Sequence, residues 1–285
     1  MTFHPQPLSP CSRVMSVQRT NLHYLAWGTP TNPPLVLLHG GSAHAHWWDH
    51  LAADLAQEYW VLALDLRGHG DSAWISPPAY EIEDYVADLE DVITTLGLAP
   101  LILLGHSLGG FIALTYASAH AQALRALVVI DMGFRLRQNR RLRLLSHLPA
   151  PVYQANKALL RRFRLLPPET RAPSPLLHDI ARHSVRRLED GGLSLKFDRA
   201  TLTRAPRDLA AFLPGITCPT LFLRGSDSQN LSAATLVEMV ALCPRAQGLD
   251  IPEAGHHVFL DNPAAFLSAV RNFLHDTTEE FPCKT

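Results

Sequence analysis

Short apolar runs alternate with longer stretches of helical periodicity through most of this chain. Four runs in the first half have the length of a strand and are apolar on both faces, and each ends beside a Gly, His or Asp: 35–38, 60–64, 101–104 and 126–130. Strands that are apolar on both faces are typical of a parallel sheet covered by helices on both sides. The alternation therefore predicts an α/β fold with a mostly parallel, doubly wound sheet.

The segments between and after these strands fit helices. In residues 82–96 the apolar side chains fall on one stripe with acidic residues opposite, and Gly97 stands just past the end. After residue 215 the pattern resumes with a strand, a helix and a short strand, at 220–223, 233–242 and 249–251. A last helix is predicted to begin at Asn262-Pro263, a favourable N-cap and first-turn pair.

Residues 133–213 interrupt this pattern. They contain no strand-like run, and they hold 17 Lys+Arg against 6 Asp+Glu, whereas the rest of the chain holds 8 against 20. We interpret them as a helical cap inserted into an α/β core of residues 14–132 and 214–275, with tails at 1–13 and 276–285. The simpler interpretation of the basic charge is a solvated helical face that meets the acidic core; the alternative is guidance of an anionic substrate.

Composition excludes several classes of protein. Of the 285 residues, 47% are hydrophobic and 18% charged, which predicts a compact fold and not a disordered chain. The formal net charge of −1 argues against a nucleic-acid partner. No apolar run approaches the length of about 18 residues that a membrane helix needs. The four cysteines form no C-x-x-C pair, so we expect a cytoplasmic protein without zinc or disulfides. Its oligomeric state is not indicated.

A candidate nucleophile lies in Gly105-His106-Ser107-Leu108-Gly109-Gly110, directly after the strand that ends at residue 104. This is a G-x-S-x-G pattern between a strand and a helix. So sharp a turn requires small residues at 105 and 109, and it presents the serine hydroxyl at the N-terminus of the helix. There the Leu108 amide is able to donate to a developing oxyanion.

Here the chain resembles the α/β-hydrolase superfamily, over nearly its whole length. His39-Gly40-Gly41 resembles the family's oxyanion loop, which implies the Gly41 amide as a second donor beside that of Leu108. The run from Asp65 to Ser72 is similar to the family's D-x-R-G-x-G-x-S turn, whose role in the family is structural. The resemblance implies a serine hydrolase that uses no cofactor.

A serine nucleophile needs a base, and histidine suits that role near neutral pH. The resemblance points to His256, which directly follows Gly255 in the loop before the last helix. For the triad acid two carboxylates remain open, Asp131 and Asp227. Many family members carry the acid at the position of Ser228, and some carry it at the position of Asp131.

Four other interpretations compete with a serine ester hydrolase. The run His44, His46, Asp49 and His50 has residue types that bind metals, but it falls in the oxyanion-loop region, so no metal is expected.

We expect a small-molecule ester, thioester or lactone as substrate, with carbon–carbon bond hydrolysis as the alternative reaction. The serine at 107 argues against epoxide hydrolases and haloalkane dehalogenases of this fold, which use aspartate. The hydroxyl at 228 also leaves open a ligand-binding module with slow turnover or none.

Overall fold

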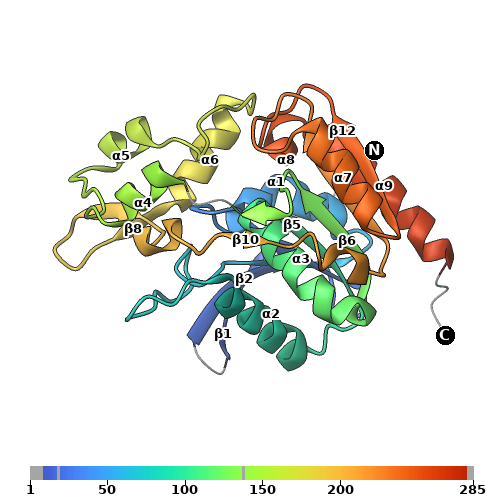
Figure 1. Ribbon diagram of the computed structural model, residues 1–285. Helices are drawn as coiled ribbons and strands as arrows, with labels where there is room; N and C mark the ends of the chain where they lie inside the picture. The colour runs from blue at the N-terminus through green and yellow to red at the C-terminus, as the bar shows by residue number, and fades with distance from the viewer. Residues whose placement is uncertain (1–8, 18–19, 137–138, 281–285) are drawn as a thin grey trace, which may run out of the picture.

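The computed structural model describes residues 9–17, 20–136 and 139–280. Its main feature is an eight-stranded sheet in the order β1-β2-β4-β3-β5-β6-β11-β12 (Figure 1). The strands are β1 (Cys11–Val17), β2 (Thr20–Trp27), β3 (Pro34–Leu38), β4 (Trp60–Leu64), β5 (Leu101–His106), β6 (Leu124–Ile130), β11 (Thr220–Gly225) and β12 (Ala246–Ile251).

The sheet is parallel from β4 to β12, and only β1 and β2 run antiparallel to their neighbours. The predicted mostly parallel sheet is therefore confirmed. Because consecutive parallel strands end at one edge, the residues after β3, β5, β6 and β11 come together there.

Helices cover both faces of the sheet. In β3 the alternating side chains divide between the faces: Val36 and Leu38 pack in one apolar cluster and Leu35 and Leu37 in the other. The first cluster includes side chains of α2, α3 and α7, and the second includes side chains of α1, α8 and α9. These helices and the short 3₁₀ segments of the core are η1 (Ala45–Trp48), α1 (Asp49–Leu55), α2 (Ile82–Leu96), α3 (Leu108–His120), η2 (Ala121–Ala123), η4 (Leu213–Gly215), α7 (Ala233–Leu242), α8 (Val258–Asp261) and α9 (Pro263–Glu280).

Between β6 and β11 the chain leaves the sheet; we call residues 133–213 the cap segment. Its helices α4, α5 and α6 gather on one side of the molecule (Figure 1). Although its sequence shows no strand-like run, two small antiparallel ladders, β7–β10 and β8–β9, accompany these helices. Its elements are β7 (Arg135–Leu136), α4 (Arg140–Ser146), α5 (Asn156–Arg162), α6 (Ser174–His183), β8 (Val185–Arg187), β9 (Leu193–Leu195), η3 (Arg199–Leu202) and β10 (Arg207–Asp208).

Ion pairs join the basic cap segment to acidic residues of the core. Arg171 pairs with Asp227 at 2.6 Å, and Lys196 pairs with Asp71 at 2.7 Å. Arg207 pairs with Glu83. These contacts agree with the simpler interpretation of the cap charge, a basic face that meets an acidic core.

The ends of the ordered fold differ from the expected boundaries. β1 begins at Cys11, three residues before the predicted start of the core, because its backbone pairs with β2. The last helix continues to Glu280, beyond residue 275. The remaining parts of the predicted tails, 1–8 and 281–285, lie outside the described residues. Within the described ranges, no helix combines the length and apolarity needed to cross a membrane.

The turn that begins at Asp65 is a polar network that holds loops in place. The buried Asp65 carboxylate accepts from the amides of Ala45 and Asp71 and lies 2.7 Å from the His23 ring. Arg67 pairs with Asp88 through two hydrogen bonds. Because these side chains are satisfied by one another, their geometry fits the structural role that the sequence predicts.

Candidate active site

Ser107 lies at a strained turn between β5 and α3. Its φ of +52° falls in a region that residues with a side chain rarely adopt. A Cβ at Gly105 would lie 2.3 Å from the Gly109 carbonyl oxygen, and one at Gly109 would lie 2.4 Å from the Leu38 carbonyl oxygen. The need for small residues at 105 and 109 is thus confirmed. The Ser107 hydroxyl is half-buried and makes no hydrogen bond to another described residue.

The loop after β3 lies against this turn. A Cβ placed on Gly40 would come within 3.3 Å of the Ser107 Cβ, so the backbone of the loop approaches the serine closely. Neither the Gly41 amide nor the Leu108 amide donates to another residue in the described part of the chain. For Leu108 the reason is general, because N–H groups in the first turn of a helix have no partner within it.

His256 is brought to the same edge of the sheet from the far end of the chain. The ring of His106, the residue before Ser107, has its centroid 4.6 Å from that of His256. Nε2 of the His106 ring lies 2.9 Å from the His256 carbonyl oxygen. This contact ties the loop that carries His256 to the turn that carries Ser107. Sequence reasoning gave His106 no role.

Asp131 is the carboxylate at the His256 ring. Its Oδ2 lies 2.8 Å from Nδ1 of His256, and its side chain is fully buried. Asp131 directly follows β6 and adopts a positive φ of +48°. Its amide donates to the Leu223 carbonyl of β11, which holds the turn in place.

Two further donors satisfy the Asp131 carboxylate. The Ser228 hydroxyl donates to Oδ2 at 2.6 Å, and the Gly225 amide donates to Oδ1 at 3.1 Å. Ser228 occupies the position at which the family resemblance implies an acid, and here its hydroxyl contacts Asp131, which follows β6. Sequence reasoning noted that position but did not predict this contact.

Burial shifts the pKa of both His256 and Asp131. It lowers the pKa of the His256 imidazole to about 3, so the ring is neutral at neutral pH. It raises the pKa of the Asp131 carboxyl to about 7, against the opposing effects of the Ser228 hydroxyl and the Gly225 amide. Above that pH the pair therefore rests as a carboxylate beside a neutral ring.

Asp227, the other candidate acid, lies elsewhere. Its carboxylate is about half exposed and pairs with Arg171 of the cap segment at 2.6 Å. Although its amide donates to the Ala254 carbonyl, near His256 in the chain, its side chain makes no contact with the His256 ring among the described interactions.

The residues of the metal-like run do not converge. His44 is buried with Nε2 at 2.8 Å from the Ser184 hydroxyl, and His50 has Nε2 at 2.9 Å from the Phe259 carbonyl. His46 and Asp49 are hydrogen-bonded at 2.8 Å, and the His44 and His46 rings meet edge to face with centroids 6.0 Å apart.

Comparison with known proteins identifies a family and several relatives to which the chain is similar. It matches the family described as the alpha/beta hydrolase fold over residues 33–263. It is 28% identical over 273 residues to 2-(acetamidomethylene)succinate hydrolase of Mesorhizobium japonicum, covering 92% of this chain and 95% of that protein. An esterase of Mycobacterium tuberculosis is 27% identical over 277 residues, covering 93% and 90%.

Solved structures agree with this relationship. The crystal structure of E-2-(acetamidomethylene)succinate hydrolase superposes with a TM-score of 0.80 at 26% identity, covering 93% of this chain and 99% of that chain. A thioesterase domain from the curacin biosynthetic pathway reaches the same TM-score at 21% identity, which supports the fold alone. With a family match over most of its length and the same architecture, the chain belongs to the α/β-hydrolase family.

Proposed function

We propose that this protein is a serine hydrolase that cleaves a small-molecule ester, thioester or lactone through an acyl-enzyme, with no cofactor. The observation that carries the proposal is the buried pair of Asp131 and His256, whose loop is tied through His106 to the strained turn of Ser107. A structural serine would not require this strain, and a buried Asp–His pair at the same edge of the sheet suits a nucleophile that needs a base.

In this mechanism Ser107 attacks the carbonyl carbon of the substrate. His256 accepts the serine proton at Nε2, because Nδ1 is held by the Asp131 carboxylate. The resulting imidazolium lies beside a buried negative charge, which stabilises it. His256 then delivers the proton to the leaving group, and water, activated by the same ring, cleaves the acyl-enzyme.

The negative charge on the carbonyl oxygen also needs donors. We assign this role to the amides of Gly41 and Leu108, which lack acceptors among the described residues. Removal of one such donor costs on the order of 100- to 1000-fold in rate in serine hydrolases.

The relatives include epoxide hydrolases as well as hydrolases of other names, and the serine at 107 favours attack at a carbonyl carbon. One of them is named as an esterase and another as a hydrolase of a substituted succinate, which is a dicarboxylate. Together with the basic cap segment, the second name motivates an acyl substrate that carries a negative charge.

The test is rapid-mixing kinetics with a set of p-nitrophenyl esters, neutral and carboxylate-bearing, of increasing acyl length. We expect an initial burst of one equivalent of p-nitrophenol per protein, followed by slower steady turnover, because an acyl-enzyme accumulates before water cleaves it. A higher kcat/KM for the charged esters supports an anionic substrate. Absence of turnover with every ester would contradict the proposal and favour a ligand-binding module.

Ser228→Ala is expected to shift the acid limb of the pH profile of kcat/KM to higher pH. The Ser228 hydroxyl donates to the Asp131 carboxylate, so its loss makes the Asp131–His256 pair bind a proton more tightly. A hydrogen bond to a charged group contributes about 1.5 kcal/mol, which corresponds to a shift of about one pH unit. Activity should fall most at pH 6–7 and approach that of the unaltered protein above pH 9.

The matched control is Ser226→Ala, in the same loop. The Ser226 hydroxyl bonds to Asp227 in an exposed position and does not contact Asp131. An acid limb that stays in place in Ser228→Ala, or that moves equally in both variants, would exclude this role for Ser228.

A further inference from the structure

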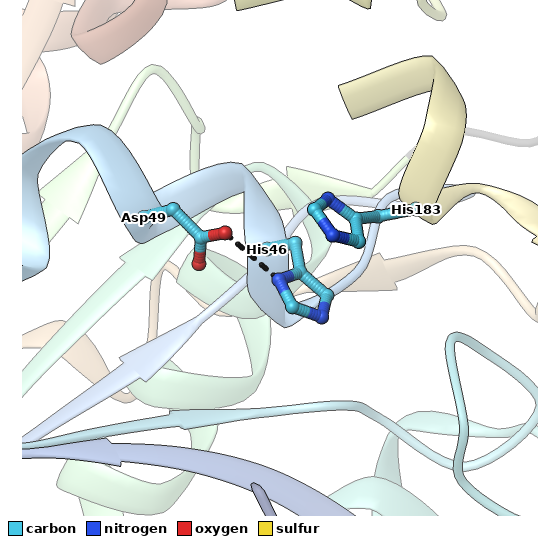
Figure 2. Close-up of side chains that lie close together, drawn as sticks. All are labelled: His46, Asp49 and His183. Atoms are coloured by element: carbon cyan, nitrogen blue, oxygen red, sulfur yellow. Dashed lines mark hydrogen bonds and ion pairs between the residues drawn. The ribbon is translucent and has the colours of Figure 1, made fainter. Parts of the chain in front are cut away.

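A cluster of metal-binding side chains lies where the cap segment meets the core. Figure 2 shows His46 and Asp49 side by side on η1 and the start of α1, with His183 reaching them from the end of α6. The rings of His46 and His183 are stacked with centroids 3.8 Å apart and an interplanar angle of 7°. One candidate ligand atom from each of the three residues falls within 4.8 Å of the other two.

The polar atoms of this cluster are incompletely satisfied. Nδ1 of His46 lies 2.8 Å from Oδ2 of Asp49, but Oδ1 of Asp49 is buried and has no hydrogen-bond partner among the described residues. A buried carboxylate oxygen without a donor is unfavourable and requires a physical explanation. A bound cation would provide one.

The charge state of the cluster suits a cation. Imidazole binds metal ions through a nitrogen of the neutral ring. Lys196, a positive side chain that acts on His183, has its ammonium paired with Asp71 at 2.7 Å. The carboxylate of Asp49 supplies the negative charge.

The spacing fits a transition metal after small rotations. Zinc binds imidazole nitrogen and carboxylate oxygen at about 2.0–2.2 Å, so two ligand atoms on a tetrahedral ion are about 3.4 Å apart. Nδ1 of His46 and Oδ2 of Asp49 lie 2.8 Å apart, and the three candidate ligand atoms all lie within 4.8 Å of one another. Because an imidazole lone pair lies in the plane of its ring, the stacked rings must tilt towards each other. None of the three side chains is fully buried, which permits this tilt and lets water take a fourth position.

We propose that His46, Asp49 and His183 form a binding site for a zinc-class transition metal ion that links the cap segment to the α/β core. Two nitrogens and one carboxylate suit zinc, cobalt or nickel, whereas magnesium and calcium prefer sites made of oxygen. The ion takes the place of the hydrogen bond between His46 and Asp49, with the ring proton moving to the other nitrogen of His46 by exchange with water, and it draws in His183 from the cap segment. Ser184, the next residue, already bonds to His44 of the core at 2.8 Å, so the ion reinforces an existing contact.

The test is zinc titration of the full-length, chelator-treated protein by calorimetry, with the absorption spectrum of bound cobalt as a second readout. We expect one saturable site in the unaltered protein and an affinity lower by about 100-fold or more in His183→Ala, because one of three ligands is lost. His178→Ala is the matched control: His178 lies on the same helix, is exposed and is outside the cluster, so its loss should leave binding unchanged. Equal melting temperatures in chelator establish that each variant is folded.

Hydrogen exchange tests the link between cap and core. Zinc is expected to slow amide exchange in α6 of the unaltered protein but not in His183→Ala, since only the former is held by the ion. Zinc binding of equal strength in all three proteins would mean adventitious binding to surface histidines and would overturn the proposal. Absence of saturable binding in the unaltered protein would do the same.

Discussion

Exchange of Asp131 for asparagine is expected to lower kcat/KM for the best ester about 10⁴-fold, whereas the same exchange at Asp227 should leave it within about twofold. The asparagine at 131 keeps the shape of the side chain but presents an amide to Nδ1 of His256. The ring then carries its proton on Nε2, where it cannot accept one from Ser107. The imidazolium also loses the buried negative charge beside it.

Asp227→Asn is the matched control because both residues follow strands at the same edge of the sheet. Its carboxylate is about half exposed, and exposed ion pairs such as that with Arg171 contribute little. Thermal unfolding of both variants separates loss of chemistry from loss of fold, since Asp131 is buried. If Asp227→Asn caused the large loss and Asp131→Asn did not, the proposed acid would be wrong.

The core of the fold was predictable because local pattern and tertiary burial agree there. The strand expected at 60–64 is β4 with the same bounds, and the helix expected at 82–96 is α2. Gly97 ends that helix in the left-handed conformation with φ of +63°, as a glycine in that place predicts. In such segments periodicity, capping and burial all favour the same structure.

The cap segment was predictable only in part. Its longest helix, α6, carries a periodic signal, but its ladders do not: β7 and β10 have two residues each, and a strand of two residues has no period. β7 and β10 form a ladder only in the folded chain, where Arg135 pairs with Asp208 across a separation of more than seventy residues. The encounter of His183 with His46 has the same origin, so the cluster could not be found from the run of residues 44–50 alone.

The choice between Asp131 and Asp227 shows where sequence reasoning ends. Parallel pairing of β6 with β11 brings the residues after both strands to one edge, so both carboxylates were reasonable candidates. Which one faces His256 depends on the backbone, and Asp131 turns inward at positive φ. The sign of φ at an aspartate is not encoded in a local pattern.

The hydroxyl of Ser228 is chemically suited to a site in which Asp131 lies at the His256 ring. A carboxylate at 228 would stand against Asp131 in a buried site, and two like charges so close cannot both ionise. A hydroxyl at the same place instead donates to Asp131. The departure from the common family pattern, which motivated a non-catalytic interpretation, is therefore compatible with an acid that follows β6.

Exchange of Ser107 for alanine is expected to lower the turnover of every ester by about 10⁵-fold or more, because loss of a serine nucleophile removes nearly all of the rate due to the triad. A fluorophosphonate probe, which reacts with activated serines, should label the unaltered protein with one equivalent and the variant not at all. Substrate affinity should change little, since the hydroxyl contributes mainly to the transition state. The exchange should also create no packing defect, because the serine side chain is only half-buried at the turn.

Ser118→Ala is the matched control for this exchange. Ser118 lies on α3, the helix that Ser107 precedes, and its hydroxyl bonds to the Thr115 carbonyl within that helix. It should retain both turnover and labelling. Full labelling of Ser107→Ala would mean that the activated serine lies elsewhere. If Ser107→Ala remained folded and kept its ester turnover, the hydroxyl at the strained turn would not be the nucleophile, and the pair of Asp131 and His256 would need another partner.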